Sequence, residues 1–130
     1  MSVDSIANFL TIIRNGILVS KPFVVTPFSR MNNALASILK QEGFIKDVQQ
    51  VEQDGKQMLK LFLKYVDGES VIHELSRASK LSRRRYSGAT EVKPVIGGLG
   101  LSILSTNRGV ITHKKAKELN VGGEVICTVW

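Results

Sequence analysis

The sequence is poor in cysteine and in long apolar runs. Its 130 residues include one cysteine, Cys127, and a single thiol cannot form an internal disulfide or a cysteine-based metal site. No apolar run approaches the roughly 20 residues that span a bilayer, and the opening stretch MSVDSIANFL lacks the charged-then-apolar layout of a signal peptide. We therefore expect a soluble protein that is not exported and whose fold does not depend on redox conditions.

Patterns typical of catalysis are also scarce. His73 and His113 lie far apart in the sequence, and neither has metal-ligand spacing to another candidate. The stretch IGGLGLS lacks the third glycine of the dinucleotide fingerprint, no Gly-Lys-Ser/Thr follows it, and Ser102 is not in a Gly-x-Ser-x-Gly elbow. Few carboxylates remain in the second half for paired acid-base chemistry. The sequence thus predicts no enzyme, no metal and no other cofactor.

What the chain does contain is enough apolar material for a core and an uneven charge. Hydrophobic residues make up 43%, which suits one globular unit or two small lobes and excludes disorder for most of the chain. Residues 1 to 76 carry eight basic and eight acidic side chains, whereas residues 77 to 130 carry ten and three, so the whole net charge of +7 lies in the second segment. A region with so large a positive charge most often attracts a polyanion, above all nucleic acid. A basic surface kept for solubility is the alternative.

The first segment has the spacing of an amphipathic helix. Its apolar residues recur on one helical face, at Ile6, Phe9, Leu10, Ile13 and Ile17. This pattern predicts a helix that begins near Asp4 and ends at Gly16. The opposite face, which includes Arg14 and Asn15, is polar and on its pattern alone is a solvated face.

A strand, a second helix and a hairpin should complete the N-terminal part. Residues 22 to 27, PFVVTP, predict a short edge strand, and Ser29 is the N-cap expected for a helix that ends at Gly43. The runs FIKDVQQVEQ and KQMLKLFLKYV flank Asp54-Gly55, a pair that favours a two-residue hairpin turn. The DGES turn at residues 67 to 70 should separate two lobes, residues 1 to 67 and 68 to 130.

The second lobe reads as mainly β with one short helix. We expect extended segments at residues 71–75, 84–86, 99–104, 109–111 and 124–130. The helix should start at Thr112 as N-cap and run through KKAKEL. Cys127 alternates with Val125 and Val129, so we interpret it as a small core residue and not as a nucleophile.

Three segments of the basic half carry chemistry suited to RNA. The run RASKLSRRRY offers five cations, Arg84 and Arg85 among them, before the ring of Tyr86, which can stack on a nucleotide. The run STNRG offers small hydrogen-bonding groups that can read an irregular RNA, and HKKAK places cations next to the same turn. An edge strand guarded by charge and an ordinary Ser/Thr-rich turn are the structural alternatives for the first two.

Four segments together resemble one family: DSIANFLTIIRNG, ILKQEGFIKDV, LFLKYVDGESVI and GLGLSILSTNRGVITHKKAKELNVGGEVICTVW. They look like the bacterial-type eighth protein of the small ribosomal subunit, in that family's order and over nearly the whole chain. The Ser-Thr-x-x-Gly after a glycine-rich strand and the closing Gly-Gly-Glu strand are the most specific features. The resemblance implies an α+β fold with two small lobes, an N-terminal α-β-α-β-β lobe and a mainly β C-terminal lobe.

The resemblance also implies a set of RNA-binding residues. In the family the C-terminal lobe recognises an irregular helix in the central domain of small-subunit ribosomal RNA through a loop that falls here on Ser105, Thr106 and Asn107. The family usually has Ser-Thr-Ser-Lys-Gly there, so Asn107 and Arg108 are departures that keep hydrogen bonding and charge. The family's other RNA-contacting positions fall on Tyr86, Gly122, Gly123, Glu124, Ser29, Arg30, Arg14 and Asn15.

The sequence therefore predicts a non-catalytic ribosomal protein that binds small-subunit ribosomal RNA during assembly. We expect it in the cytoplasm or in an organelle such as the plastid. Its other expected partners are neighbouring ribosomal proteins, and no membrane partner is expected. Some members of the family also repress their own messenger RNA, and the sequence leaves that open for this chain. The runner-up is a protein-protein adaptor whose basic lobe meets an acidic partner. Salt and nuclease sensitivity separates the two, because RNA binding weakens steeply with salt. An enzyme ranks third.

Overall fold

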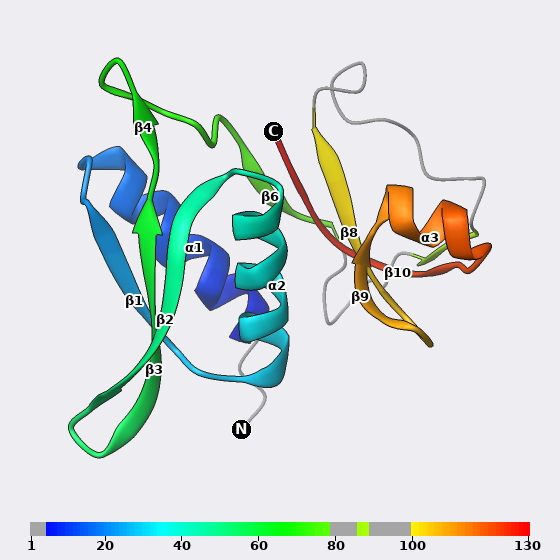
Figure 1. The fold of residues 1–130 in the computed structure, drawn as a ribbon, viewed down its shortest axis with the longest axis horizontal. Helices are drawn as coiled ribbons and strands as arrows, with labels where there is room; N and C mark the ends of the chain where they lie inside the picture. The colour runs from blue at the N-terminus through cyan, green and yellow to red at the C-terminus, as the bar shows by residue number, and fades with distance from the viewer. Residues whose placement is uncertain (1–4, 79–85, 89–99) are drawn as a thin grey trace. The chain divides into compact units, whose positions relative to one another are not determined.

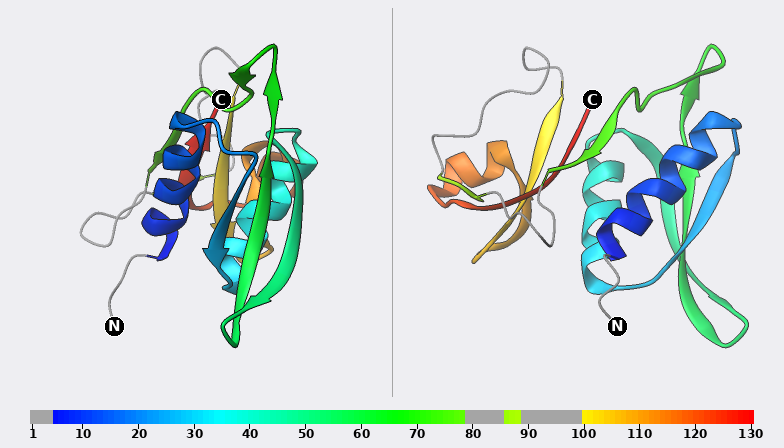
Figure 2. Two further views of the ribbon diagram at one scale, coloured as in Figure 1. Left: turned by 90° about the vertical axis from the view of Figure 1, so that its left-hand side faces the viewer. Right: turned by 180° about the vertical axis from the view of Figure 1, so that it is seen from behind.

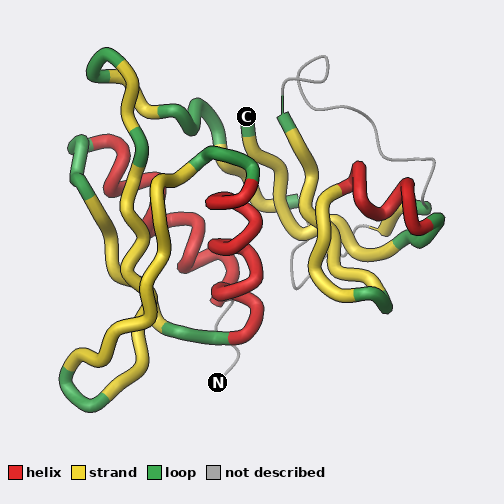
Figure 3. The backbone as a smooth tube through the Cα atoms, viewed as in Figure 1, coloured by secondary structure: helices red, strands yellow, loops and turns green. Residues whose placement is uncertain are grey.

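The computed structural model describes residues 5–78, 86–88 and 100–130, and its chain divides into two compact units, Met1–Ile72 and His73–Trp130. The elements of the first unit are α1 (Ser5–Leu18), β1 (Phe23–Pro27), α2 (Arg30–Gln41), β2 (Ile45–Gln53), β3 (Lys56–Leu63), β4 (Tyr65–Val66) and β5 (Glu69–Ser70) (Figure 1). Those of the second are β6 (Leu75–Arg77), β7 (Tyr86–Ser87), β8 (Leu101–Thr106), β9 (Gly109–Thr112), α3 (His113–Leu119) and β10 (Gly123–Val129). The expected α+β class is confirmed (Figure 3).

The first unit is built on an antiparallel sheet with the order β1-β3-β2. One face of this sheet is apolar and is covered by helix, with α1 lying across it (Figure 2). Alternate residues of the central strand β3, Leu59, Leu61 and Leu63, are buried there. The buried residues that α1 and α2 contribute to this core are Phe9, Leu10, Ile13, Leu35, Ala36, Ile38 and Leu39.

Helix α1 differs from the expectation at its end. It continues past Gly16 to Leu18, so the prediction that Gly16 stops the helix is wrong. Gly16 is buried where α1 meets β1, and a Cβ atom at this position would collide with the side chain of Val24. The glycine therefore serves close packing of helix on strand and has no role in ending the helix.

Three further predictions for the first unit are confirmed, whereas the strand predicted for residues 56–66 ends at Leu63 and Tyr65–Val66 form the separate strand β4. The Ser29 hydroxyl accepts a hydrogen bond from the backbone N–H of Asn32 at 3.0 Å, which caps α2. Gly43 follows the end of α2 with a φ of +83°. Asp54 and Gly55 have φ values of 54° and 76°, the left-handed backbone that a tight hairpin turn between β2 and β3 requires.

The turn at residues 67 to 70 closes a small hairpin. Asp67 and Gly68 both have positive φ, and they join β4 to β5, in which Tyr65 pairs with Ser70. Because this hairpin is part of the first unit, the structure divides after Ile72, whereas the sequence placed the division after residue 67.

The extended segment expected at residues 71–75 is confirmed only for its last two residues, since Glu74 and Trp130 exchange two backbone hydrogen bonds of 3.0 Å just ahead of β6. The N–H of Val71 donates to the Lys64 carbonyl and that of Ile72 to the Ser70 hydroxyl, so both belong to the end of the small hairpin. The strand begins only at Leu75, which pairs with Val129 of β10.

The second unit contains a sheet with the order β6-β10-β8-β9, and β7 also pairs with β10. Helix α3 packs on β8 and β9 through the buried Ala116, and the Thr112 hydroxyl caps it by accepting the N–H of Lys115 at 3.2 Å. This cap was predicted and is confirmed. The buried residues of β8 and β10 are Leu101, Ser102, Ile103, Leu104, Ile126, Cys127 and Val129.

Candidate nucleic-acid interface

Three strands of the second unit bring predicted site residues into one row. Tyr86 of β7 lies opposite Glu124 of β10, and Glu124 lies opposite Ser105 of β8. Directly opposed residues of antiparallel strands project from the same face of a sheet. The phenol, the carboxylate and the hydroxyl, which are separated by long stretches of sequence, therefore form a row that we call the polar row. Tyr86 is 72% exposed, so its ring is accessible to a ligand.

A glycine permits the close approach of the strands at this place. Gly123 lies opposite both Ser87 and Thr106, next to the polar row. A Cβ atom at Gly123 would collide with the backbone carbonyl of Ser105. A carbonyl within a strand cannot swing aside as the end of a side chain can, so only glycine keeps β10 in register with β8 here.

The loop between β8 and β9 uses one of its two hydroxyls internally. The Thr106 hydroxyl donates to the Gly109 carbonyl at 2.9 Å and accepts the N–H of Arg108 at 3.0 Å. Gly109 has a φ of +103°, which favours glycine. The Ser105 hydroxyl, by contrast, has no hydrogen-bond partner among the described residues. Of the two hydroxyls, Ser105 is the one available to a ligand.

Exposed cationic side chains lie in this loop and in the helix that follows it in the sequence. Arg108 and Asn107 are exposed at the tip of the loop. Lys114, Lys115 and Lys117 are exposed on α3, which directly follows β9. The only acidic residue of α3 is Glu118, so the helix is positive overall. Arg84 and Arg85, the other predicted cations, lie outside the described residues.

The predicted N-terminal site residues are exposed, with one exception. Arg14, Asn15 and Arg30 are exposed, and the Arg14 guanidinium donates to the Thr11 hydroxyl at 3.2 Å. Ser29 is only partly exposed, and its hydroxyl already caps α2. A direct contact of this hydroxyl with RNA would compete with the cap.

Comparisons with known proteins agree with one another. The family model described as Ribosomal protein S8 matches residues 4–130. This chain belongs to the ribosomal protein S8 family. It is 48% identical to the small ribosomal subunit protein uS8 of Rhodopirellula baltica over 132 residues, 99% of each chain. It is 51% identical to the uS8 of Lactobacillus johnsonii over 129 residues and 48% identical to that of Enterococcus faecalis over 128, in both cases 98% of this chain and 97% of the relative.

Members of the S8 family are structural, non-enzymatic ribosomal components, in agreement with the expectation that this chain is not an enzyme. The groups that could suggest catalysis have structural surroundings. Cys127 is buried, and this burial raises the pKa of its thiol to about 12, so the thiolate is absent at neutral pH. The Nδ1 atom of His113 accepts the backbone N–H of Ser102 at 3.1 Å. The last residue pair between β8 and β9 is Ile103 with Thr112. The next backbone N–H of β8, that of Ser102, therefore bonds to the His113 ring where a longer β9 would offer a backbone carbonyl.

In the described residues, 5–78, 86–88 and 100–130, no three His, Cys, Asp or Glu side chains come together as metal ligands would. None of the helices in the same part of the chain has the length and apolar character needed to cross a membrane.

The sequence reasoning missed one surface of the first unit, an open groove of about 570 Å³ between α1 and β1. Val19, Lys21 and Phe23 contribute to its lining. The signals available in the sequence were the apolar segment PFVVTP and the apolar pair Leu18 and Val19 shortly before it.

Proposed function

We propose that this S8-family chain binds the central domain of small-subunit ribosomal RNA through its second unit and thereby organises an irregular helix during assembly of the subunit. The polar row is the observation that carries this proposal. It combines an exposed ring, a carboxylate, and the Ser105 hydroxyl, which has no hydrogen-bond partner among the described residues, next to a loop and a helix that carry exposed cations.

Each group has a distinct chemical task in this proposal. The Tyr86 ring stacks on an unpaired base, which single-stranded or bulged RNA can present. The Glu124 carboxylate accepts hydrogen bonds from the amino group of a base, and the Ser105 hydroxyl bonds a base edge or a ribose 2′-hydroxyl. Arg108 and the lysines of α3 contact phosphates, which supplies affinity without specificity.

The first unit has a secondary part in RNA binding. The exposed Arg14, Asn15 and Arg30 contact the RNA backbone, while Ser29 contributes by capping the helix that carries Arg30. Residues 1 to 76 carry no net charge, so we assign them the smaller share of the electrostatic affinity.

The wider setting follows from this role. We place the protein in the cytoplasmic ribosome, in contact with ribosomal RNA and with neighbouring proteins of the small subunit. A messenger RNA that mimics the ribosomal site would bind the same polar row, because the row recognises the shape and base edges of an irregular helix and not its origin.

Filter binding of the full chain to a central-domain RNA fragment tests the proposal, with a scrambled RNA of equal length as control. We expect tight, salt-sensitive binding to the fragment, weaker binding to the scrambled RNA, and loss of the complex after nuclease treatment. Equal affinity for both RNAs would contradict recognition of the central domain. A pulldown of partners that resists both salt and nuclease would favour the protein-protein adaptor.

A further inference from the structure

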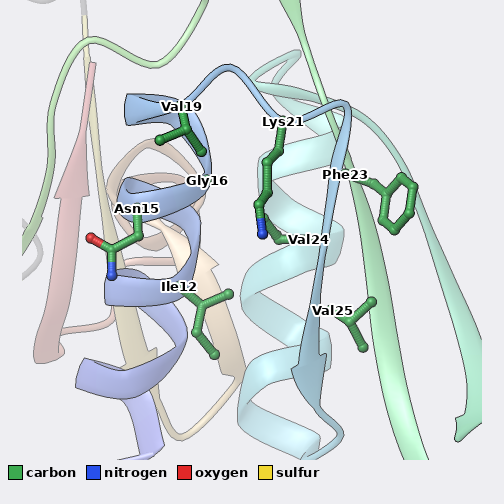
Figure 4. Close-up of a pocket in the computed structure, with 8 residues that line it drawn as sticks. All are labelled: Ile12, Asn15, Gly16, Val19, Lys21, Phe23, Val24 and Val25. Carbon is green, nitrogen blue, oxygen red and sulfur yellow. The ribbon is translucent and has the colours of Figure 1, made fainter.

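The groove between α1 and β1 has rigid, well-supported walls. Figure 4 shows Val19 and Asn15 on the α1 side and Lys21 extending between α1 and β1. The loop that leads into β1 is fixed, because the N–H of Lys21 donates to the Gly16 carbonyl at 2.9 Å and the Lys21 carbonyl accepts the Tyr65 hydroxyl at 2.6 Å. The groove is therefore formed before any ligand arrives.

One wall of the groove is β1, which is an edge strand of its sheet among the residues that the structure describes. Two hydrogen bonds flank β1, from the Leu63 N–H to the Pro22 carbonyl and from the Phe28 N–H to the Gln57 carbonyl. In an antiparallel pair, alternate residues face the partner strand, so the even-numbered residues of β1 bond to β3. The N–H and C=O groups of Phe23 and Val25 consequently point away from β3, toward the open edge.

Apolar side chains are exposed along the same edge. Leu18 is 80% exposed, Val19 67% and Phe23 39%. Soluble proteins seldom expose such neighbouring large apolar groups unless another molecule covers them. Lys21 is the one charged residue among those described as lining the groove.

We propose that this groove binds an extended segment of another protein of the small subunit, which adds to β1 as an antiparallel or parallel strand. Backbone groups of the segment would pair with those of Phe23 and Val25, and its apolar side chains would cover Val19 and Phe23. A carboxylate of the segment would pair with the Lys21 ammonium. The groove lies in the first unit and the polar row in the second, so the polar row can be right or wrong independently of this proposal. Asn15, however, lines the groove and is also one of the proposed secondary RNA contacts, so a strand in the groove and RNA at Asn15 compete for this place.

RNA is the less suitable occupant for two reasons. A nucleic-acid strand would need several cations for its phosphates, and the lining residues supply only Lys21. Nucleic acid also has no regular row of alternating donors and acceptors at strand spacing, which is what the edge of β1 presents.

Photocrosslinking in assembled small subunits tests the proposal. A benzophenone amino acid replaces Val19 in the full chain, and the crosslinked product is mapped by mass spectrometry. We expect a crosslink to one segment of another ribosomal protein, with apolar side chains at alternate positions and at least one Asp or Glu. A crosslink to RNA, or none in the assembled subunit, would overturn the proposal.

A matched pair of proline substitutions isolates the backbone edge. Val25→Pro removes an N–H that points to the groove, and Gln50→Pro removes the corresponding outward N–H at the other free edge, on β2. We expect Val25→Pro to lower the crosslink yield roughly tenfold and Gln50→Pro to leave it unchanged. Equal yields in the two variants would show that no strand pairs with β1.

A second pair keeps the test independent of folding. Lys21→Glu reverses the groove charge, and Lys56→Glu makes the same change at the exposed hairpin between β2 and β3. With melting temperatures matched, only Lys21→Glu should reduce the crosslink. If Lys21→Glu leaves the crosslink yield unchanged, no carboxylate of the segment pairs with Lys21. If Val25→Pro also leaves the yield unchanged, the proposal as a whole is contradicted.

Discussion

The two units of this S8-family chain differ in what their surfaces offer a partner. The first, residues 1–72, is nearly balanced in charge, with eight basic and seven acidic side chains, but contains most of the exposed large apolar residues among those described, namely Leu18, Val19, Phe23 and Val66. The second, residues 73–130, has ten basic and four acidic side chains, and the exposed large residue in its described part is an aromatic one, Tyr86. The first surface therefore suits a protein segment and the second suits RNA, so one small chain can hold both within an assembly.

The glycines make the same contrast at the level of packing. Gly16 in the first unit leaves room for the side chain of Val24, which joins a helix to a strand. Gly123 in the second leaves room for the backbone carbonyl of Ser105, which brings two strands together beside the polar row. One glycine stabilises a core, whereas the other also shapes a candidate site.

Charge removal should give the largest effect. Combining Arg108→Gln with Lys115→Gln in the full chain should weaken binding to the central-domain RNA by about tenfold to a hundredfold and lower the salt slope by roughly 0.9 for each lost phosphate contact. Combining Lys46→Gln with Lys56→Gln removes the same charge from the first unit and should have little effect. Filter binding across a salt series measures both, and equal losses would contradict the division of labour.

Adding a methyl group at each glycine sharpens the comparison. Gly123→Ala should destabilise the fold by about 1–3 kcal/mol and also weaken specific RNA binding, though by less than the double charge change, because β10 must shift away from Ser105. Gly16→Ala should cost a comparable amount of stability but leave the RNA affinity of the folded protein intact. Thermal melts and binding assays on the same preparations separate these outcomes, and intact binding by Gly123→Ala would mean that the polar row is not the site.

The two hydroxyls of the loop should behave differently although they are adjacent. Ser105→Ala should reduce specific RNA affinity by roughly 1–3 kcal/mol with no loss of stability, since its hydroxyl has no hydrogen-bond partner in the described part of the chain. Thr106→Ala removes two hydrogen bonds within the turn and should lower the melting temperature, at a cost of about 1 kcal/mol. If Thr106→Ala melted normally but lost specific binding, these two assignments would be reversed.

The smallest effect concerns an ion pair of the first unit. A hydrogen bond from the Lys40 ammonium at 2.9 Å, helped by the N–H of Val48, lowers the pKa of Asp47 from its usual 3.8. Because the folded-state pKa is the lower one, the pair stabilises the fold at neutral pH and loses this contribution as the pH falls below about 4. Asp47→Asn should remove the part of the fall in melting temperature below about pH 4 that comes from this pair. If the melting temperatures of parent and variant depend on pH in the same way, solvent screens the pair completely.

The sequence was sufficient wherever a local rule decides the structure. The N-cap hydroxyls of Ser29 and Thr112 and the turn at Asp54-Gly55 all follow from short-range chemistry, and all three are confirmed. Gly16 was misjudged because a helix-stopping glycine and a glycine in helix-strand contact look the same in one sequence. Only the position of Val24 distinguishes them.

Long-range pairing explains what the sequence could not supply. Tyr86, Ser105 and Glu124 were each singled out, but their alignment in one row depends on the register of three strands. The commitment of the Thr106 hydroxyl to Gly109 and Arg108 is a matter of turn geometry, which a Ser-Thr-Asn-Arg-Gly pattern leaves open. The groove along β1 likewise exists only once α1 and β1 are packed together.

Directed hydroxyl-radical cleavage tests the central claim most directly. An iron chelate is attached to Asn107→Cys in the second unit or to Val66→Cys in the first, and the buried Cys127, with its pKa of about 12, stays unmodified. In complexes with small-subunit ribosomal RNA, we expect strong, localised cleavage of the central domain from position 107 and little from position 66. Strong cleavage from position 66 with none from position 107 would contradict RNA recognition by the second unit.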